Sequence, residues 1–271
     1  RINGIAAIKS TGANVVRLEI NEQTTDTQLE GALATVLNAG MVAIVTLTAD
    51  GTKLTCSEDS AYLLSSVDSL WLKKWIPILA EDRFQGNVMI NIANGWGPTD
   101  IFNQDSLGYQ EYIDTYKALI RKFRDAGFKL PLVIDAPSCG QDYNAFLNGR
   151  SRELMAADTA KNLIFAAHAD GAKWNTSDKI VNAATMLYNE KVPFILTGIT
   201  GSGVAGVDEA PIDHMDVINK SIGDVALSLN LPWGSASDTV AYKTDLATPL
   251  DVRGGVVLSS NVFLDKLKRE L

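Results

Sequence analysis

The sequence predicts an α/β fold of the (β/α)8 TIM-barrel type. Apolar segments rich in β-branched residues recur along the chain, and they alternate with segments whose apolar residues repeat at helical spacing. The chain has 271 residues, of which 46% are hydrophobic, so it can form one large core of the size usual for a single barrel. We therefore expect one domain over residues 1–271, with no internal linker.

The strand candidates are short apolar runs with little polar alternation. Such runs are typical of parallel strands that have helices on one side and a filled barrel interior on the other. They occupy residues 15–20, 42–48, 88–94, 132–136, 163–168, 194–199 and 228–233. Alternating strands and helices also fit an open doubly wound sheet, but the number of strand candidates favours the barrel.

The segments between the strand candidates have the spacing of amphipathic helices. Apolar residues within 29–37 share one helix face, and those within 109–123 share another. Thr27 with Glu30 fits a capping box at the start of the first of these helices. Gly127 follows the second helix, where a left-handed residue commonly ends one.

The start of the chain leaves the barrel one strand short. Residues 2–10 have a helical pattern, so the first strand of an eight-stranded barrel is not in the sequence. Either the barrel has a gap between its second and eighth strands, or a late segment such as 255–259 fills it. The chain begins at Arg1 without Met, so we expect a mature or trimmed product from which any signal peptide has been removed.

Composition excludes several classes of function. The net charge is −8 and no basic stripe offsets it, which makes nucleic acid an unexpected partner. No apolar run approaches the roughly 20 residues that a transmembrane helix needs. His168 and His214 are the only histidines and share no ligand motif, so neither a metal nor another cofactor is expected. Cys56 and Cys139 are either free thiols, the commoner outcome, or one disulfide between loops.

Several segments at predicted strand ends carry recognisable motifs. They are GANVVRL at 12–18, AGMV at 39–42, NIAN at 91–94, DAPSCGQ at 135–141 and DTAKNLIFAAH at 158–168. In this order the segments resemble glycoside hydrolase family 5 (clan A), the endo-β-mannanases and endoglucanases. The resemblance implies a barrel enzyme that hydrolyses O-glycosyl bonds of β-linked polysaccharides without a cofactor. It also implies a secreted, periplasmic or cell-surface location.

Both catalytic carboxylates of that family are missing here. The family's acid/base Glu directly follows N-x-A-N, where this chain has Gly95, and the nucleophilic Glu corresponds to Ile199. Retaining glycosidases need two carboxyl groups about 5–5.5 Å apart. Glycine and isoleucine cannot replace them, so we expect a catalytically degenerate relative, or pseudoenzyme, with no catalytic residue.

Polar and aromatic residues of the family's cleft are nevertheless retained. The resemblance gives the candidate substrate-binding residues Arg17, Asn94, Trp96, Asp135, Gln141, His168, Asp170 and Trp233. Without a nucleophile, Arg17 is expected to pair with Asp170 or Glu19. His168 either contacts the glycan or belongs to a buried polar network, and Trp96 and Trp233 either stack on sugars or pack in the core. Trp71, Trp75 and Trp174 are expected to pack between helices and barrel.

Three functions compete. The leading expectation is a non-catalytic domain that binds or senses a β-linked polysaccharide or oligosaccharide. The second is a structural protein with a closed cleft that docks a protein partner. The third is a glycoside hydrolase with relocated carboxylates, for example Asp170 with Asp135 or Glu19.

Overall fold

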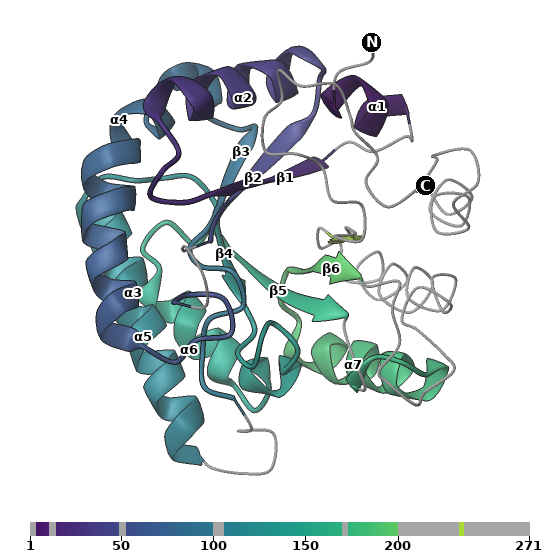
Figure 1. Cartoon of the computed structure of the whole chain (residues 1–271). Coiled ribbons are helices and arrows are strands. Elements are labelled where there is room, and N and C mark those ends of the chain that lie inside the picture. Colours follow the sequence, from purple (N-terminus) through teal and green to yellow (C-terminus); the bar gives the residue numbers. More distant parts are fainter. Residues whose placement is uncertain are drawn as a thin grey trace.

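The computed structural model describes residues 4–10, 15–48, 53–99, 106–169, 173–199 and 233–235, which form a curved parallel sheet covered by helices. The strands are β1 (Val15–Ile20), β2 (Val42–Leu47), β3 (Val88–Asn91), β4 (Leu132–Asp135), β5 (Leu163–Ala169), β6 (Phe194–Ile199) and β7 (Trp233–Ser235). They lie side by side in sequence order, whereas a doubly wound sheet reverses its order at a switch point. This order and the curvature in Figure 1 confirm the predicted barrel-type fold.

The two ends of the described sheet are β1 and β7. Within the described ranges, β1 pairs only with β2 and β7 only with β6. The predicted strand 228–233 overlaps β7 at Trp233, which is in register with Phe194, and residues 228–232 lie outside the described residues. Segment 255–259, one candidate for closing the barrel, lies outside the described residues.

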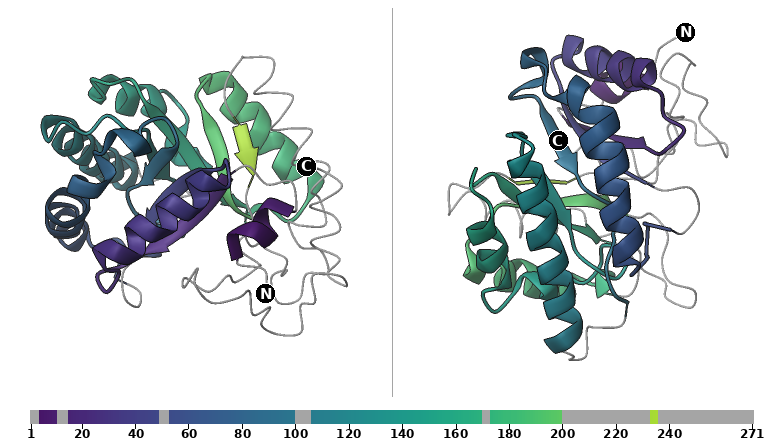
Figure 2. Two further views of the ribbon diagram at one scale, coloured as in Figure 1. Left: turned by 90° about the horizontal axis from the view of Figure 1, so that it is seen from above. Right: turned by 90° about the vertical axis from the view of Figure 1, so that its left-hand side faces the viewer.

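Helices cover the outer side of the sheet. They are α1 (Gly4–Ser10), α2 (Asp26–Asn38), α3 (Ser60–Ser66), η1 (Val67–Trp75, a π-helix), α4 (Ile76–Leu79), α5 (Ser106–Asp125), α6 (Arg150–Ala157) and α7 (Ser177–Glu190), with 3₁₀ turns η2 (Asp82–Phe84) and η4 (Tyr143–Phe146). Figure 1 and Figure 2 show α2, α3, α5 and α6 on the convex side of the sheet. Among the helices of the described ranges, none has the length and apolarity needed to cross a membrane.

The start of α2 differs from the predicted one. Thr25, not Thr27, is the N-cap, and its side chain accepts a hydrogen bond from the Gln28 amide. The Gln28 side chain in turn accepts one from the Thr25 amide. The predicted partner Glu30 instead forms an ion pair with Arg83. Both threonines satisfy the sequence pattern, and the structure uses the earlier one.

The core lies mainly between the sheet and the helices. Trp71, Trp75 and Trp174 are at most 1% exposed, which confirms their prediction as packing residues. The indole of Trp71 donates to the Ile92 carbonyl, so its polar edge is satisfied inside the core. A second, smaller apolar cluster consists of Ile44, Val133, Ile164 and Ala166, on the opposite, inner face of the strands. This inner layer forms the floor beneath the site described next.

Candidate functional site

Polar residues gather at the carboxyl ends of the strands, on the inner face. Side chains of a strand alternate between faces, so Asp135 shares a face with Val133 and His168 with Ile164, both members of the inner cluster. Arg17 is paired in register with Ile44, another member of that cluster. In barrel enzymes the active site lies at this end of the strands. The fold therefore brings Arg17, Asp135 and His168 to the place where a family 5 site is expected.

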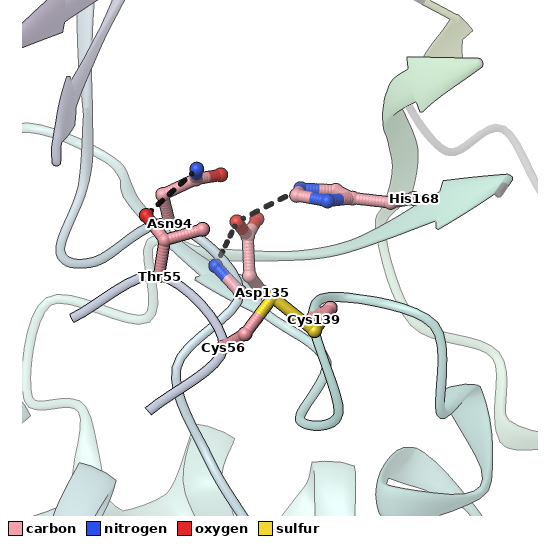
Figure 3. The surroundings of a disulfide bond; sticks show 7 residues. Thr55, Cys56, Asn94, Asp135, Cys139 and His168 are labelled. Carbon is pink, nitrogen blue, oxygen red and sulfur yellow. Dashed lines mark hydrogen bonds and ion pairs between the residues drawn. A yellow bond between two sulfur atoms is a disulfide. The ribbon is translucent and has the colours of Figure 1, made fainter. Parts of the chain in front are cut away.

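Asp135 is the centre of a buried hydrogen-bond network (Figure 3). Its Oδ1 accepts from Asn91 Nδ2 at 2.6 Å and from the Thr197 hydroxyl at 3.4 Å. Its Oδ2 accepts from the Gly95 amide at 3.0 Å and lies 3.2 Å from His168 Nε2. Asn91 ends β3 and Gly95 follows it, His168 is in β5, and Thr197 is in β6. The carboxylate therefore joins neighbouring parts of the barrel mouth.

The environment favours the ionised form of Asp135. Burial alone would raise the pKa of its carboxyl, but the charge and hydrogen bond of His168 oppose that effect, with help from Arg17 and the Gly95 amide. The net result is a pKa below the ordinary value. A fully buried carboxylate with four hydrogen-bond contacts has no exposed surface for a substrate, so its position supports a structural role.

Arg17 and Asn94 form a second, more accessible polar group. Arg17 Nη2 donates to Asn94 Oδ1, and Nη1 forms an ion pair with Glu19 at 3.1 Å. Of the two anions expected for Arg17, Glu19 is thus a partner, whereas Asp170 lies outside the described residues. Asn94 Nδ2 donates to Thr55 Oγ1 at 3.1 Å, so the Asn94 amide is held between Arg17 and Thr55. The Glu19 side chain is 46% exposed and Asn94 is half-buried, so this group can be reached by a ligand.

The acid/base position has no room for a side chain. Gly95 is buried and has φ +59°, a left-handed conformation that residues with a Cβ rarely adopt. A Cβ built on Gly95 would lie 2.7 Å from the Cys139 carbonyl carbon and 2.9 Å from the Gly140 nitrogen. The loop after β4 therefore leaves no room for a side chain at the position that the resemblance aligns with the family's proton donor. A Glu at position 95 requires this loop to move.

A disulfide joins Cys56 to Cys139 across this position. Of the two alternatives for the cysteines, the structure has the cross-link between loops. It links the segment after β2 to the segment after β4, which are 83 residues apart in sequence (Figure 3). The strand between these two in the sheet is β3, whose end leads into Gly95. We call residues 55–56 together with 138–140 the disulfide strap.

The strap also packs against His168. The His168 amide donates to the Gly140 carbonyl at 2.8 Å, and a Cβ on Gly140 would lie 2.4 Å from the imidazole Cγ. His168 is 9% exposed. Of its two predicted roles, membership of a buried polar network is the one its position favours.

The remaining predicted site residues are distributed differently. Trp96 is 1% exposed and packs against Tyr112 and Tyr116, with ring centroids 6.2 and 5.7 Å away. Its position is that of a core residue, the second of the two roles predicted for it. Gln141 contributes its main chain, because its carbonyl accepts a hydrogen bond from the Trp174 indole.

Other predicted residues are only partly described. Trp233 opens β7 and Ile199 ends β6, where it is in register with Ala169. The side chains of Trp233 and Ile199 are outside the described part of the structure, as is the whole of Asp170.

Sequence reasoning missed Thr55, Asn91 and Thr197. Asn91 and Thr197 could have been found from strand alternation. Met89 and Ile195 pack on the inner cluster, and Asn91 and Thr197 follow them by two residues, so they face the same side of the sheet. Thr55 carries no sequence signal, because its role depends on the path of a loop. No group of three or more His, Cys, Asp or Glu residues within the described segments could hold a metal ion.

Comparisons with known proteins show what this chain is similar to. No family model matches the chain. It is 30% identical over 109 residues to β-mannanase/endoglucanase A of Caldicellulosiruptor saccharolyticus, a match that covers 40% of this chain and 8% of that protein. It is 25% identical over 201 residues to a mannan endo-1,4-β-mannosidase of Streptomyces lividans, covering 72% of this chain and 49% of that protein. The matches thus span at most about half of these relatives.

Solved structures give the same result for the fold. The mannohexaose complex of Thermomonospora fusca β-mannanase superimposes with a TM-score of 0.63 at 19% identity, over 92% of this chain and 80% of that chain. A likeness at this identity establishes the fold. Together with the curated relatives, it confirms the predicted resemblance to family 5 mannanases and endoglucanases.

Proposed function

We propose that this chain, which resembles the family 5 mannanases and endoglucanases in sequence and fold, binds a neutral β-linked polysaccharide without cleaving it. The observation that carries the proposal is the covered acid/base position at Gly95. Where the family has a proton donor, this chain has a glycine in a left-handed conformation against the disulfide strap.

Hydrolysis with relocated carboxylates is the less favoured function. A retaining mechanism needs one carboxyl to protonate the leaving oxygen and a second to attack the anomeric carbon. Asp135 is fully buried and occupied by hydrogen bonds. Glu19 is accessible but forms an ion pair with Arg17, and a single carboxylate does not make a catalytic pair. Asp170, the third candidate, has no described position to support it.

The retained polar group supports glycan recognition. Arg17, Glu19 and Asn94 present donors and acceptors at the edge of the barrel mouth, which suits a row of sugar hydroxyls. The mannanase of similar fold binds mannohexaose, so a β-1,4-mannan oligosaccharide is the first ligand to test. The net charge of −8 disfavours acidic polysaccharides and favours a neutral chain.

We also propose a secreted, periplasmic or cell-surface location for a single-domain protein. Disulfides persist mainly in oxidising compartments, and Cys56–Cys139 is such a bond. The location implied by the family resemblance is in agreement with this.

Calorimetry with mannohexaose, cellohexaose and xylohexaose tests the proposal. We expect binding to at least one of them, and Asn94→Ala to weaken it about tenfold through the loss of one or two hydrogen bonds. Arg83→Ala is the control, because Arg83 forms ion pairs with Glu30 and Glu81 far from the site. Equal loss in both variants contradicts the assigned site.

The same oligosaccharides are incubated with the protein and their reducing ends are measured. We expect no turnover above buffer. Hydrolysis at an ordinary enzymatic rate overturns the non-catalytic assignment, whereas failure to bind any of the three glycans overturns glycan recognition. The second candidate function is a scaffold with a closed cleft that docks a protein partner, and the covered position at Gly95 also favours it. Failure to bind any of the three glycans would favour this scaffold over glycan recognition.

A further inference from the structure

We propose that the Cys56–Cys139 disulfide is a redox-sensitive positioning element, which holds the Arg17–Asn94 group in its binding geometry and releases it on reduction. This inference rests on the proposed function for its effect on glycan affinity. Its structural part, the dependence of the polar network on the cross-link, stands on contacts within the chain.

The first contact runs from Cys56 to Arg17 through two side chains. Thr55 directly precedes Cys56, and its hydroxyl accepts the hydrogen bond from Asn94 Nδ2 at 3.1 Å. The amide oxygen of Asn94 faces the Arg17 guanidinium, so the Asn94 side chain is held from both ends. If Thr55 moves away, the Asn94 side chain is held by Arg17 alone and can rotate more freely, so Arg17 loses a fixed acceptor.

The second contact runs from Cys139 to the buried carboxylate. The backbone of Cys139 and Gly140 lies against Gly95, whose amide donates to Asp135. The Gly140 carbonyl accepts from the His168 amide. The strap thus touches both polar groups of the site, one through each of its ends.

The backbone of the strap adopts conformations that non-glycine residues rarely adopt. Cys56, Ser138 and Cys139 have φ values of 56°, 57° and 59°. Residues are kept in this region only where the surrounding structure holds them. Because the cross-link joins two of these three residues, its removal allows both segments to relax.

The two sides of the strap are not anchored equally. On the Cys139 side, the Gln141 carbonyl accepts from the buried indole of Trp174, and the Tyr109 hydroxyl donates to Asp142 at 2.7 Å. On the Cys56 side, the Gly97 amide donates to the Ser57 carbonyl at 2.9 Å, and the Trp96 indole donates to the Asp59 carbonyl at 3.3 Å. The Cys139 side has a further anchor within the strap itself, because the Gly140 carbonyl accepts from the His168 amide at 2.8 Å. We therefore expect reduction to displace mainly the Thr55–Cys56 segment.

The bond is accessible to a dithiol reductant, since Cys56 is exposed and Cys139 is half-buried. A thiolate of the reductant attacks one sulfur, the other cysteine leaves as a thiolate and takes up a proton, and a mixed disulfide forms. The second thiolate of the reductant then displaces the first cysteine as a thiol. Two electrons pass to the protein disulfide, and the dithiol becomes a cyclic disulfide.

Hydrogen exchange and mannohexaose affinity are measured on the full chain before and after treatment with dithiothreitol. We expect the Gly97 amide, which donates to the Ser57 carbonyl, to exchange faster after reduction and the affinity to fall about tenfold, as for one or two lost hydrogen bonds. The double variant Cys56→Ser with Cys139→Ser is the control. It should behave like the reduced protein and should not respond to dithiothreitol.

Unchanged exchange at Gly97 after verified reduction overturns the proposal, whatever the glycan result. Faster exchange without glycan binding in either redox state overturns the proposed function and leaves the structural dependence standing. Faster exchange with unchanged affinity overturns the claim that the disulfide controls glycan binding.

Thr55→Ala tests the route with the disulfide intact, in case the reduced protein unfolds. We expect its affinity for mannohexaose to fall as much as on reduction. Thr185→Ala, which removes a hydroxyl that donates to the Val181 carbonyl of its own helix, should bind as the wild type does. Wild-type affinity in Thr55→Ala contradicts the route from Cys56 to Arg17.

Discussion

Gly95 combines two constraints that a side chain would violate. Its φ of +59° is unfavourable for other residues, and the space where a Cβ would lie is filled by the backbone of Cys139 and Gly140. Gly127 shares only the first constraint, because it has φ +82° and nothing within 4 Å of its Cβ position. Substitutions at Gly127 and Gly95 can therefore be compared to distinguish the cost of an unfavourable φ from the cost of a steric clash.

We expect Gly95→Ala to lower the free energy of unfolding by about 2–4 kcal/mol, as the sum of an unfavourable φ and an overpacked contact. Gly127→Ala should cost about 1 kcal/mol, from φ alone. Urea denaturation at pH 7 measures both. Equal losses would show that the strap does not restrict position 95.

Asp135 is expected to stabilise the barrel mouth. Asp135→Ala leaves Asn91, Gly95 and His168 without their buried acceptor, and we expect a loss of about 3–5 kcal/mol. The matched variant Asp114→Ala removes an exposed carboxylate that pairs with Lys117, so it should change stability by less than about 1 kcal/mol. Thermal and urea unfolding of the two variants provide the comparison, and similar losses would contradict the central role of Asp135.

Sequence motifs predicted many residues of the candidate site, but the contacts made by its loops could not be predicted. Arg17, Asn94, Asp135 and His168 were found because their motifs fall at strand ends, and the parallel sheet brings strand ends together. The role of Thr55 could not be predicted. It depends on a contact between loops that are far apart in sequence, and no local pattern encodes that contact.

Elements are joined at the opposite end of the barrel by a buried ion pair. The Arg124 side chain, at the end of α5, donates through Nε to Asp158, which directly follows α6, at 2.6 Å. Asp158 also accepts from the amides of Ala160 and Asn162 at the start of β5. The pair therefore fixes two helix ends and a strand relative to one another.

This pair predicts a pH dependence of stability. Burial would raise the pKa of Asp158, but hydrogen bonds and charge from Arg124, together with the backbone amides, lower it below the ordinary value. A carboxyl with a lowered folded pKa stabilises the protein above its unfolded pKa of about 3.9, and this contribution is lost as pH falls through the folded pKa. We expect Asp158→Asn to cost about 2–3 kcal/mol at pH 7 and progressively less in acid. Urea unfolding between pH 7 and pH 3 measures the difference, and a constant difference would contradict the assignment.

At the scale of elements, sequence patterns located strands better than helix ends. The predicted strands 15–20 and 194–199 match β1 and β6 in both bounds, because strand burial leaves a direct apolar signature. The start of α2 was wrong by two residues. Thr25 and Thr27 are both followed three residues later by Gln or Glu, and only the chain path before the helix selects Thr25.

For the whole molecule, the order of the strands could be predicted from the sequence, but whether they close into a complete barrel could not. A chain that alternates strands and helices specifies neighbouring parallel strands, and β1 to β7 follow that order. Whether a further strand pairs with the edge of β1 cannot be read from the alternation of strands and helices. The disulfide likewise joins segments whose proximity follows only from the complete sheet.

That cross-link encloses a large part of the barrel, since its cysteines are 83 residues apart and the intervening chain includes α3, β3, α5 and β4. A disulfide stabilises mainly by restricting the unfolded chain, more so for long loops. We therefore expect Cys56→Ser with Cys139→Ser to lower the free energy of unfolding by about 2–4 kcal/mol.

The denaturant slope separates this effect from a loss of native contacts. An unfolded chain without the cross-link is more expanded and exposes more surface, so the slope of the urea transition should increase in the double variant. Reduction of the wild type should give the same slope. If the double variant loses stability with an unchanged slope, the disulfide acts through the folded barrel mouth alone, and the restriction of the unfolded chain is not the cause.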